Sequence, residues 1–513
     1  MIDLNPHQIK ACKIIKESTK GIFQYPTGTG KTLIQSSSIV EDILANNQPG
    51  RVYVVLSPRI LLANQLFSEI HDLLKAKEID AQYLLVHSGK VNEEDDLDED
   101  ADVASVKNNL PYREIHSTTS SGNIKKEYER AIRENVPLII CGTYHSAFRI
   151  KASEVPLRIV HCDEAHNTVA EDKTELKGFG WIPTGFDAQS EKIFFFTATL
   201  KVSTVEGGVG MNNKASYGEI LDSMTPKEAV INGLIVGPRM HVVTTVAVTD
   251  ENEDAADIKA ITESFKQHRS LLNIGAKILV VCKGSQHLSS LMEASKFFKD
   301  LRMVKPRLKI FDISSKYGPR INGEIVDREE FLKTLQGLDN DDEAIIFHID
   351  ILSEGIDVPG ITGVMPLNNM KMSKFLQTLG RATRIHNIDR QRLKDKEILA
   401  SEAAKHVKPY AWLIVPYYGE QKEELHGNFE EKIHALREYG FKAEEHIFIK
   451  QSKGAGIPVV IGHLNEVERK TNKLLEFTEE ICHSLEEEEE YQRIYEATAN
   501  LTNLELIEGL IDF

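Results

Sequence analysis

Short apolar runs alternate with amphipathic segments along most of this chain of 513 residues. In the first half, the apolar runs predict strands at 51–57, 82–87, 138–141, 157–162 and 192–197. In the second half, they predict strands at 240–246, 277–281, 308–313, 344–348, 363–366 and 411–415. Near-continuous apolar strands separated by helical patterns are typical of parallel sheets that helices cover on both faces. The pattern therefore predicts an α/β protein with two parallel sheets.

Turn-forming residues indicate how the chain is divided. The segment 200–239 contains Gly207-Gly208 and Gly237-Pro238, and we expect it to connect the two sheets. We expect a first domain over residues 1–235, a second over 236–425 and a small helical C-terminal region over 426–513. Residues 88–128 are acidic and then rich in serine and threonine, which favours a surface insertion in the first domain.

The most informative stretch is residues 25–32, which read Tyr-Pro-Thr-Gly-Thr-Gly-Lys-Thr between an apolar run and a helix-like run. A strand, a glycine-bearing turn and a helix together form a phosphate cradle, because backbone N–H groups and the helix N-terminus face the anion. A lysine adds a point charge. The generic pattern has glycine where this chain has Tyr25. We expect a nucleoside triphosphate to contact Thr27, Gly28, Thr29, Gly30, Lys31 and Thr32.

A second candidate element follows the predicted strand 157–162, which ends in Asp163-Glu164-Ala165-His166. Ligands of open parallel sheets lie at the carboxyl ends of the strands, where these two carboxylates would lie. Hydrolysis of ATP needs one carboxylate to hold hydrated Mg²⁺ and another to orient the attacking water. Asp163 with Thr32 suits the metal and Glu164 suits the water. An exposed acidic loop is the competing interpretation, and the apolar residues before the acids disfavour it.

These two motifs together resemble the DEAH-type superfamily 2 helicases, and further motifs of that family follow in order over residues 1–418. The resemblance implies two tandem RecA-like domains, ATP hydrolysis and a nucleic-acid partner. It also implies roles for more residues. Gln8, in the run Leu4-Asn5-Pro6-His7-Gln8, would contact adenine, and the run 352–359 would bring Gly355 and Asp357 to the nucleotide. The run Phe196-Thr197-Ala198-Thr199 and His166 would couple hydrolysis to strand handling.

Residues expected at the nucleic-acid backbone come partly from this resemblance and partly from chemistry. Tracking along a strand without reading its sequence needs polar and basic groups at the phosphates. The candidates are Pro58, Arg59, Gly142, Thr143, Lys283, Ser314 and Ser315.

The run 377–384 supplies Gln377, Arg381 and Arg384 as further catalytic candidates. The departing γ-phosphate accumulates negative charge that a guanidinium can neutralise. Arg381 and Arg384 are three residues apart, so a helix would place both on one face. They belong to the second predicted sheet and Lys31 to the first, which predicts that two domains close on one nucleotide. Two surface arginines on an amphipathic helix is the competing interpretation.

The details of these motifs favour DNA over RNA. Thr197-Ala198-Thr199 replaces the Ser-Ala-Thr of RNA-remodelling relatives, and Gln377 stands where they have histidine. The segment 217–234 is similar to restriction-enzyme motor subunits and to phage or repair DNA helicases. The chain is therefore expected to be an ATP-dependent DNA helicase or translocase. An RNA helicase, or an ATP-gated DNA-binding subunit of a larger complex that does not separate strands, remains the alternative.

Composition changes this picture little. The net charge of −17 looks wrong for a nucleic-acid motor, but the windows 91–102 and 476–490 carry eight acids each. Local basic patches decide binding to a polyanion, so the total charge excludes nothing. The five cysteines Cys12, Cys141, Cys162, Cys282 and Cys482 show no metal-ligand spacing. With neither a secretory signal nor an apolar run of membrane-spanning length, we expect a cytoplasmic protein that avoids membranes.

Overall fold

The buried apolar runs of the first half form one sheet whose neighbouring strands are all parallel. Its described strands are β1 (Lys20–Gln24), β2 (Val52–Ser57), β3 (Gln82–Val86), β4 (His116–Thr118), β5 (Leu138–Thr143), β6 (Leu157–Cys162), β7 (Ser190–Thr197) and β8 (Glu219–Ser223). They lie side by side in the order β4-β3-β5-β2-β6-β7-β1-β8. Because every strand points the same way, all their carboxyl ends lie along one edge.

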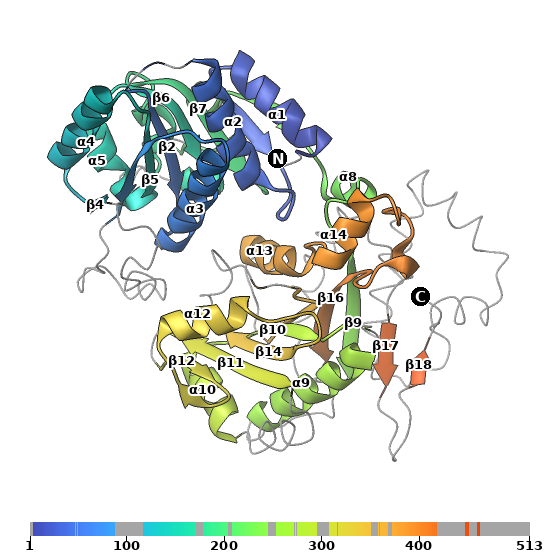
Figure 1. Ribbon diagram of the computed structural model, residues 1–513. Coiled ribbons are helices and arrows are strands. Elements are labelled where there is room, and N and C mark those ends of the chain that lie inside the picture. Colours follow the sequence, from blue (N-terminus) through green and yellow to red (C-terminus); the bar gives the residue numbers. More distant parts are fainter. Residues whose placement is uncertain are drawn as a thin grey trace. The chain divides into compact units, whose positions relative to one another are not determined.

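This computed structural model describes residues 4–46, 48, 50–87, 116–170, 178–203, 208–244, 253–270, 272, 274–294, 307–314, 317–349, 358, 360–367, 372–417, 447–450 and 459–461. The chain divides into two compact units, the first ending at Thr225 and the second beginning at Pro226. Figure 1 labels the elements of both units.

Helices cover both faces of the first sheet. The described helices of this unit are α1 (Pro6–Glu17), α2 (Lys31–Ala45), α3 (Ile60–Ala76), α4 (Ser121–Glu134), α5 (Ala147–Ala152), α6 (Ile182–Gly185) and α7 (Lys214–Tyr217), with 3₁₀ turns η2 (Tyr144–Ser146) and η3 (Ala165–Thr168). Alternate strand residues feed two cores: Val55 packs with α1, α2 and α3, whereas Val54 packs with α4 and α5. Figure 1 shows these two groups of helices on opposite sides of the sheet.

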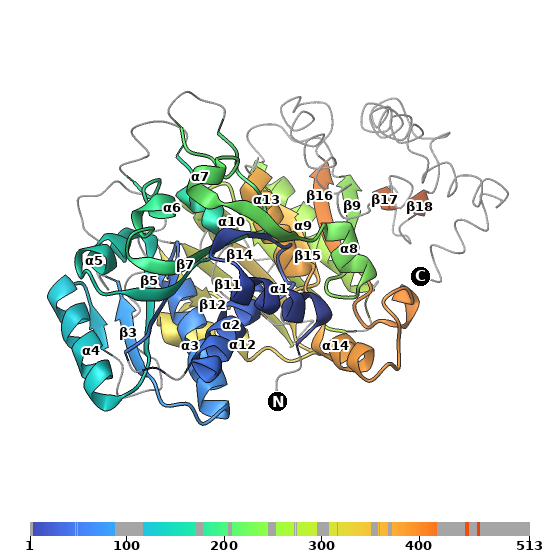
Figure 2. The ribbon, with the colours of Figure 1, turned by 90° about the horizontal axis from the view of Figure 1, so that it is seen from above.

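The buried apolar runs of the second half form a second sheet. Its described strands are β9 (Pro238–Thr244), β10 (Lys277–Val281), β11 (Leu308–Ser314), β12 (Gly318–Ile321), β13 (Glu324–Ile325), β14 (Glu343–His348), β15 (Gly363–Pro366), β16 (Ala411–Tyr417), β17 (Ile447–Lys450) and β18 (Val459–Ile461). Their order is β13-β12-β11-β14-β10-β15-β16-β9-β17-β18. The strands from β11 to β17 are parallel, and antiparallel strands extend both edges. The neighbours β9 and β16 lie together in Figure 1 and Figure 2.

The described helices of the second unit are α8 (Pro226–Ile231), α9 (Glu253–Ser270), α10 (Ser285–Ala294), α12 (Arg328–Gln336), α13 (Met372–Ala382) and α14 (Asn387–Lys394), with the 3₁₀ turn η6 (Ala403–Lys405). Phe265 of α9 and Leu288 of α10 pack in one core with alternate residues of β10, β11 and β14. Phe331 of α12 and Phe375 of α13 are also fully buried. Figure 1 shows α9 and α10 on one side of this sheet and α12 and α13 on the other.

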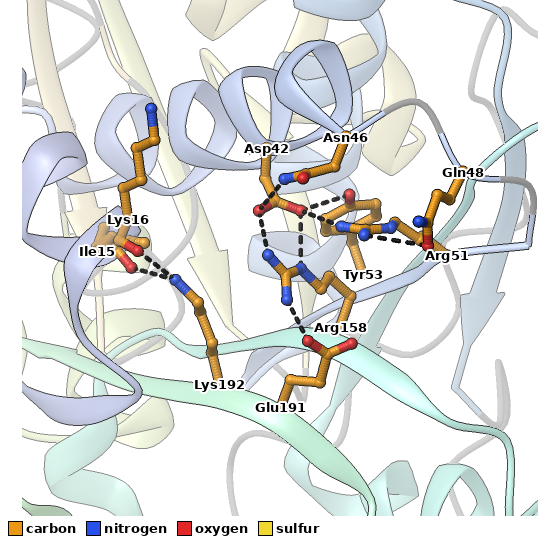
Figure 3. Close-up of polar contacts among 10 residues, drawn as sticks. All are labelled: Ile15, Lys16, Asp42, Asn46, Gln48, Arg51, Tyr53, Arg158, Glu191 and Lys192. Carbon is orange, nitrogen blue, oxygen red and sulfur yellow. Dashed lines mark hydrogen bonds and ion pairs between the residues drawn. The ribbon is translucent and has the colours of Figure 1, made fainter.

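The amino edge of the first sheet is tied together by a polar network (Figure 3). Asp42, near the end of α2, accepts hydrogen bonds from Arg158 at 2.8 and 3.0 Å and from the Tyr53 hydroxyl at 2.8 Å. Burial alone would disfavour the ionised carboxylate, but these partners outweigh it and lower the pKa of Asp42 below its usual range. On the neighbouring strand, Lys192 Nζ donates to the carbonyls of Ile15 and Lys16 at 2.8 and 2.7 Å, which closes the last turn of α1.

The predicted strands are confirmed to within about two residues at each end, and so is the α/β class with parallel sheets. The sequence pattern missed the strands at or near sheet edges: β4, β8, β12, β13, β17 and β18. The expected insertion at 88–128 contains β4 and the start of α4 at its end, and residues 88–115 lie outside the described ones. The expected connecting segment 200–239 contributes β8 to the first sheet.

In the region expected to be helical, 426–513, the described residues form β17 and β18. The stretches from which helices were predicted there, 429–436, 467–475 and 491–510, lie outside the described residues. Among the helices that the structure describes, we find none with the length and apolar character needed to cross a bilayer.

Candidate functional site

The loop after β1 is shaped for close approach to a ligand. Gly28 and Gly30 adopt φ angles of 91° and 83°, in the left-handed region that disfavours residues with a Cβ atom. A Cβ atom on Gly30 would lie 2.4 Å from Gln8 Nε2. The helix α2 begins at Lys31 directly after this glycine, so its first N–H groups and its positive end lie at the loop. The loop has the geometry of a phosphate cradle.

The N-terminal turn of α1 is fastened to this loop. Gln8 is 2% exposed, and its Nε2 atom lies 3.3 Å from the Thr29 carbonyl and 3.4 Å from the Gly30 carbonyl. Its other amide atom, Oε1, accepts a 2.8 Å bond from the backbone N–H of Asn5. His7 adds a hydrogen bond of 2.9 Å to Thr29 O. The structure thus places Gln8 beside the cradle, and its contact with adenine stays a prediction.

Lys31 is nearly buried, with 7% of its surface exposed. Its ammonium donates to the Tyr25 carbonyl at 3.3 Å and lies 3.8 Å from Glu164 Oε1. The cation is therefore held at the loop by one carbonyl and one carboxylate. A bound phosphate could replace either partner of the Lys31 ammonium, because 3.3 Å is long for a hydrogen bond and 3.8 Å is long for an ion pair.

Asp163 and Glu164 lie where β6 ends, on the same edge of the sheet as the loop. Asp163 is anchored by its N–H, which bonds Leu56 O at 2.8 Å, and its Oδ1 atom accepts a 2.8 Å bond from Gln35. Burial, reinforced by the charge of Glu164, raises the pKa of Asp163 to about 7. A buried carboxylate with a raised pKa beside another acid is a place where a cation would be stabilised.

The oxygen donors near Asp163 fit a hard cation such as Mg²⁺. Thr32 lies in the first turn of α2, next to Lys31, and Glu164 Oε2 is a buried oxygen without a hydrogen-bond partner. Magnesium typically takes one or two protein carboxylates and completes its shell with waters and substrate phosphates. The described residues hold no group of three or more His, Cys, Asp or Glu side chains that could bind a metal by themselves.

A chain of polar contacts joins this acidic pair to the end of β7. His166 Nδ1 lies 3.5 Å from Glu164 Oε2 and 3.2 Å from Thr197 Oγ1. The Thr197 hydroxyl donates to Thr199 O at 2.8 Å and accepts from Thr199 N at 3.2 Å. Burial lowers the pKa of His166, so the ring is neutral. The three predicted coupling residues therefore form one chain of contacts, which reaches Glu164 through His166.

The candidate nucleic-acid residues of the first unit also meet at this edge. Ser57 and Thr143 are register partners at the ends of β2 and β5, so Pro58 and Arg59 start beside Gly142 and Thr143. A Cβ atom on Gly142 would lie 3.0 Å from Val86 O, which explains the glycine. The Thr143 hydroxyl donates to Ser146 Oγ at 3.3 Å. These residues form one neighbourhood along the carboxyl edge.

In the second unit, Lys283 follows β10 and directs its ammonium to Asp257 of α9, at 3.1 Å. His287 shares the same carboxylate oxygen at 2.9 Å. Ser314 ends β11 and is 2% exposed, with its hydroxyl accepting from Tyr317 N. Ser315, Gly355 and Asp357 lie outside the described residues. A nucleic-acid role for Lys283 and Ser314 stays a prediction.

The two candidate arginines are not on one helical face, and that prediction is wrong. The helix α13 ends at Ala382, so it contains Gln377 and Arg381, and Arg384 lies beyond it. Arg384 instead pairs with Ile235 in an isolated antiparallel bridge, and Val236 N bonds Thr383 O at 2.8 Å. Pairing with a distant segment stops the helix where local spacing would have continued it.

Two residues of the site escaped the sequence analysis. Gln35 lies one helical turn after Lys31 and bonds Asp163, and the i, i+4 spacing was a signal that could have revealed it. The Tyr144 hydroxyl donates to Asp163 O at 2.5 Å across 19 positions, for which the sequence carries no local signal.

Comparisons with known proteins agree with this geometry. Residues 5–106 match the DEAD/DEAH box helicase family. No curated protein matches the sequence. Among solved structures, the ATP-dependent Type ISP restriction-modification enzyme LlaBIII bound to DNA is 19% identical, with a TM-score of 0.60 over 86% of this chain and 30% of that one. A nuclease-deletion mutant of the Type ISP enzyme LlaGI, in complex with a DNA substrate mimic, is 18% identical, with a TM-score of 0.53 over 86% of this chain and 29% of that one.

The DUF1998 helicase MrfA bound to DNA is 12% identical, with a TM-score of 0.51 over 83% of this chain and 48% of that one. At these identities the likeness establishes the fold. The chain spans about 30% of the length of the two Type ISP enzymes. Residues 5–106 thus match the DEAD/DEAH box helicase model, and the chain shares the fold of the LlaBIII, LlaGI and MrfA structures.

Proposed function

We propose that this protein hydrolyses ATP and couples the reaction to movement along, or unwinding of, DNA. The observation that carries the proposal is the unbroken set of contacts from Lys31 to Glu164, His166 and Thr197 along one sheet edge. These contacts link Lys31, which would hold phosphate, to Glu164, which would orient the attacking water. They continue to Thr197 at the end of β7, on the sheet edge where the candidate nucleic-acid residues of the first unit lie.

The chemistry divides among the residues of the first unit. The loop from Thr27 to Gly30 would cradle the phosphates, and Lys31 would move from Tyr25 O and Glu164 to the β and γ phosphates. Gln8 would contact adenine from its fixed position beside Thr29. Thr32 and Asp163 would hold Mg²⁺, which neutralises charge on the phosphate oxygens when bound. Glu164 would accept a hydrogen bond from the attacking water and align it with the γ-phosphate.

The second unit would supply positive charge to the same reaction. Arg381 and Arg384 are proposed to stabilise the charge on the γ-phosphate, and Gln377 lies one turn before Arg381 on the same helix. Gly355 and Asp357 are proposed as further nucleotide contacts. We assign the catalytic loop to a domain over residues 1–235 and the arginines to a domain over 236–425.

DNA is the proposed partner. The three similar structures named above were each solved with DNA or a DNA mimic. Pro58, Arg59, Gly142 and Thr143 would meet its backbone. The Type ISP enzymes are about three times as long as this chain, which supports a second candidate function: an ATP-driven motor within a larger assembly that moves on duplex DNA without separating strands.

ATP turnover on a panel of nucleic acids tests the proposal. Wild-type protein is assayed with single-stranded DNA, duplex DNA, forked DNA and RNA, and Lys31→Ala is the inactive reference. We expect stimulation by DNA and a loss of about a hundredfold or more in Lys31→Ala. Strand displacement on a fork distinguishes unwinding from movement on duplex. Stimulation by RNA alone would select an RNA helicase, and turnover indifferent to every nucleic acid would refute the proposal.

A cytoplasmic location is also proposed. The four cysteines in the described part of the chain are buried free thiols, as expected in a reducing compartment.

A further inference from the structure

A buried lysine in the second unit holds the backbone of one candidate arginine. Lys408 lies between η6 and β16 and has no exposed surface. Its side-chain nitrogen donates a hydrogen bond of 2.6 Å to the carbonyl oxygen of Arg384. A hydrogen bond in a buried site is stronger than one in water, and a buried carbonyl left without its partner is costly. The contact therefore fixes the position of that peptide group.

The backbone of Lys408 is itself held rigidly. Asp389 of α14 is fully buried, and its two carboxylate oxygens accept the N–H groups of Val407 and Lys408, each at 2.9 Å. The helix α14 begins after His386, whose Nδ1 accepts the N–H of Ile388 at 3.3 Å. The chain thus forms a closed loop that leaves Arg384, runs through α14 and returns to Arg384 through the Lys408 side chain.

Arg384 depends on such support because it lies outside α13. The helix ends at Ala382, so Arg384 lies beyond its last residue. The strand-like pairing with Ile235 and Val236 holds the chain on one side, and Lys408 holds the Arg384 carbonyl on the other. A guanidinium at the end of a long side chain is aimed by the backbone from which it starts, so a shift in the Arg384 peptide moves the charge.

We propose that Lys408 is a positioning residue for Arg384: it sets the place of the guanidinium in ATP hydrolysis without contacting the nucleotide. This inference rests on the proposed function, in which Arg384 stabilises the γ-phosphate. It predicts that loss of Lys408 lowers turnover more than nucleotide binding, because an arginine of this kind acts on the transition state.

The test is a double-mutant cycle on the full chain. Lys408→Met keeps the length and bulk of the side chain but removes the donor. We expect it to lower kcat of DNA-stimulated ATP hydrolysis roughly tenfold while KM for ATP changes less than about twofold, as for a transition-state interaction. Lys405→Met is the matched control, because Lys405 is on the same segment but forms an exposed ion pair with Glu402. It should leave kcat and KM unchanged.

The decisive comparison uses Arg384→Ala as the background. If Lys408 acts through Arg384, Lys408→Met will cause no further loss once Arg384 is alanine. An equal loss in both backgrounds would show that Lys408 serves general structure and would overturn the inference, as would an unchanged kcat in Lys408→Met alone. An Arg384→Ala enzyme with wild-type kcat would instead refute the role of Arg384 in the proposed function, and the inference with it.

A second variant keeps the test open if Lys408→Met does not fold. Asp389→Asn removes one of the two oxygens that hold the Val407 and Lys408 backbone, and keeps the size of the side chain. Asp389→Asn should also lower kcat, and this effect should disappear in the Arg384→Ala background. Additive losses in this cycle would contradict the inference equally.

Discussion

The hydroxyl group of Tyr25 donates a 2.6 Å hydrogen bond to Asp222, across 197 positions of the chain. Tyr25 stands where the generic phosphate-binding pattern has glycine, and its side chain is fully buried. Asp222 lies on β8, where a register shift opposite Ile22 and Phe23 places it beside β1. Lys10 of α1 completes the contact at 2.7 Å. Burial and the bond to Asp222 raise the pKa of Tyr25, so the hydroxyl remains a donor.

Tyr25→Phe should therefore destabilise the first unit. The change removes the hydroxyl and leaves Asp222 in an ion pair with the mostly exposed Lys10. We expect the free energy of unfolding in urea to fall by about 1–2 kcal/mol, the usual cost of removing a donor from a partly buried carboxylate. Nucleotide binding should change little, because the Tyr25 carbonyl that faces Lys31 remains. Equal stability of variant and wild type would contradict this account of the residue.

Lys192→Met should loosen α1 and weaken nucleotide binding. Lys192 is the donor that closes the last turn of α1 (Figure 3). At its other end, α1 carries Gln8. Removing a charged donor from two partly buried carbonyls should cost about 1–3 kcal/mol in the free energy of unfolding. The KM for ATP should rise, whereas kcat at saturation should change little. Lys214→Met, at an exposed pair with Glu219, is the control expected to have no effect. An unchanged KM in Lys192→Met would show that the last turn of α1 does not influence nucleotide binding.

Gln35→Leu should weaken the response to Mg²⁺. Gln35 Nε2 orients the Asp163 carboxylate at 2.8 Å, and partners that orient a metal ligand typically contribute 10–100-fold in affinity. We expect the Mg²⁺ concentration for half-maximal ATP turnover to rise by about tenfold or more, with most of the activity recovered at high Mg²⁺. Ser38→Ala is a control on the same helix, because the Ser38 hydroxyl bonds His161 and the Gln35 backbone carbonyl and not an acid of the site. A wild-type Mg²⁺ response in Gln35→Leu would show that Asp163 is oriented by other contacts.

The buried Lys408 predicts a stability difference that depends on pH. Burial, and then the positive charges of Arg384, Lys277 and Arg390, lower the pKa of Lys408 to about 7, although Asp389 opposes the shift. Between pH 7 and the ordinary lysine pKa of about 10.4, the unfolded chain binds a proton at Lys408 that the folded chain does not. The contribution of Lys408 to the free energy of unfolding therefore rises with pH between these two values.

Urea unfolding of wild type and Lys408→Met at pH 7, 8, 9 and 10 measures this contribution. The stability of wild type relative to the variant should increase along the series. The difference should flatten below about pH 7, where both states carry the proton. A difference that does not rise between pH 7 and 10 would mean that the folded protein holds Lys408 charged.

The sequence predicted those parts of the fold that depend on local pattern. Continuous apolar runs predicted the central strands because burial on both faces leaves no room for polar residues, as in β2, where every residue is buried. Every residue of the edge strand β8 is exposed or half-buried, and only its pairing with β1 makes it a strand. Motif spacing likewise indicated that Gln8, Lys31, Asp163 and His166 lie near one another, because each follows or precedes a central strand of one parallel sheet.

The contacts that the sequence could not predict cross long stretches of chain. The end of α13 is set by pairing with residues near 235, so Arg384 left the helical face expected for it. The ammonium of Lys283, a candidate nucleic-acid contact, bonds Asp257, 26 positions away. The bond from Lys408 to Arg384 spans 24 positions and has no periodic signal. Such pairs follow from tertiary packing, which apolar periodicity and motif spacing do not encode.

The most direct test of the central claim is ATP turnover by wild type and Glu164→Gln, each with and without single-stranded DNA. Glu164 is proposed to orient the attacking water, so the glutamine variant should still bind ATP while its DNA-stimulated turnover falls by at least about a hundredfold. Wild type should hydrolyse ATP faster when DNA is present. Turnover in Glu164→Gln equal to that of wild type, under the same DNA stimulation, would contradict the account.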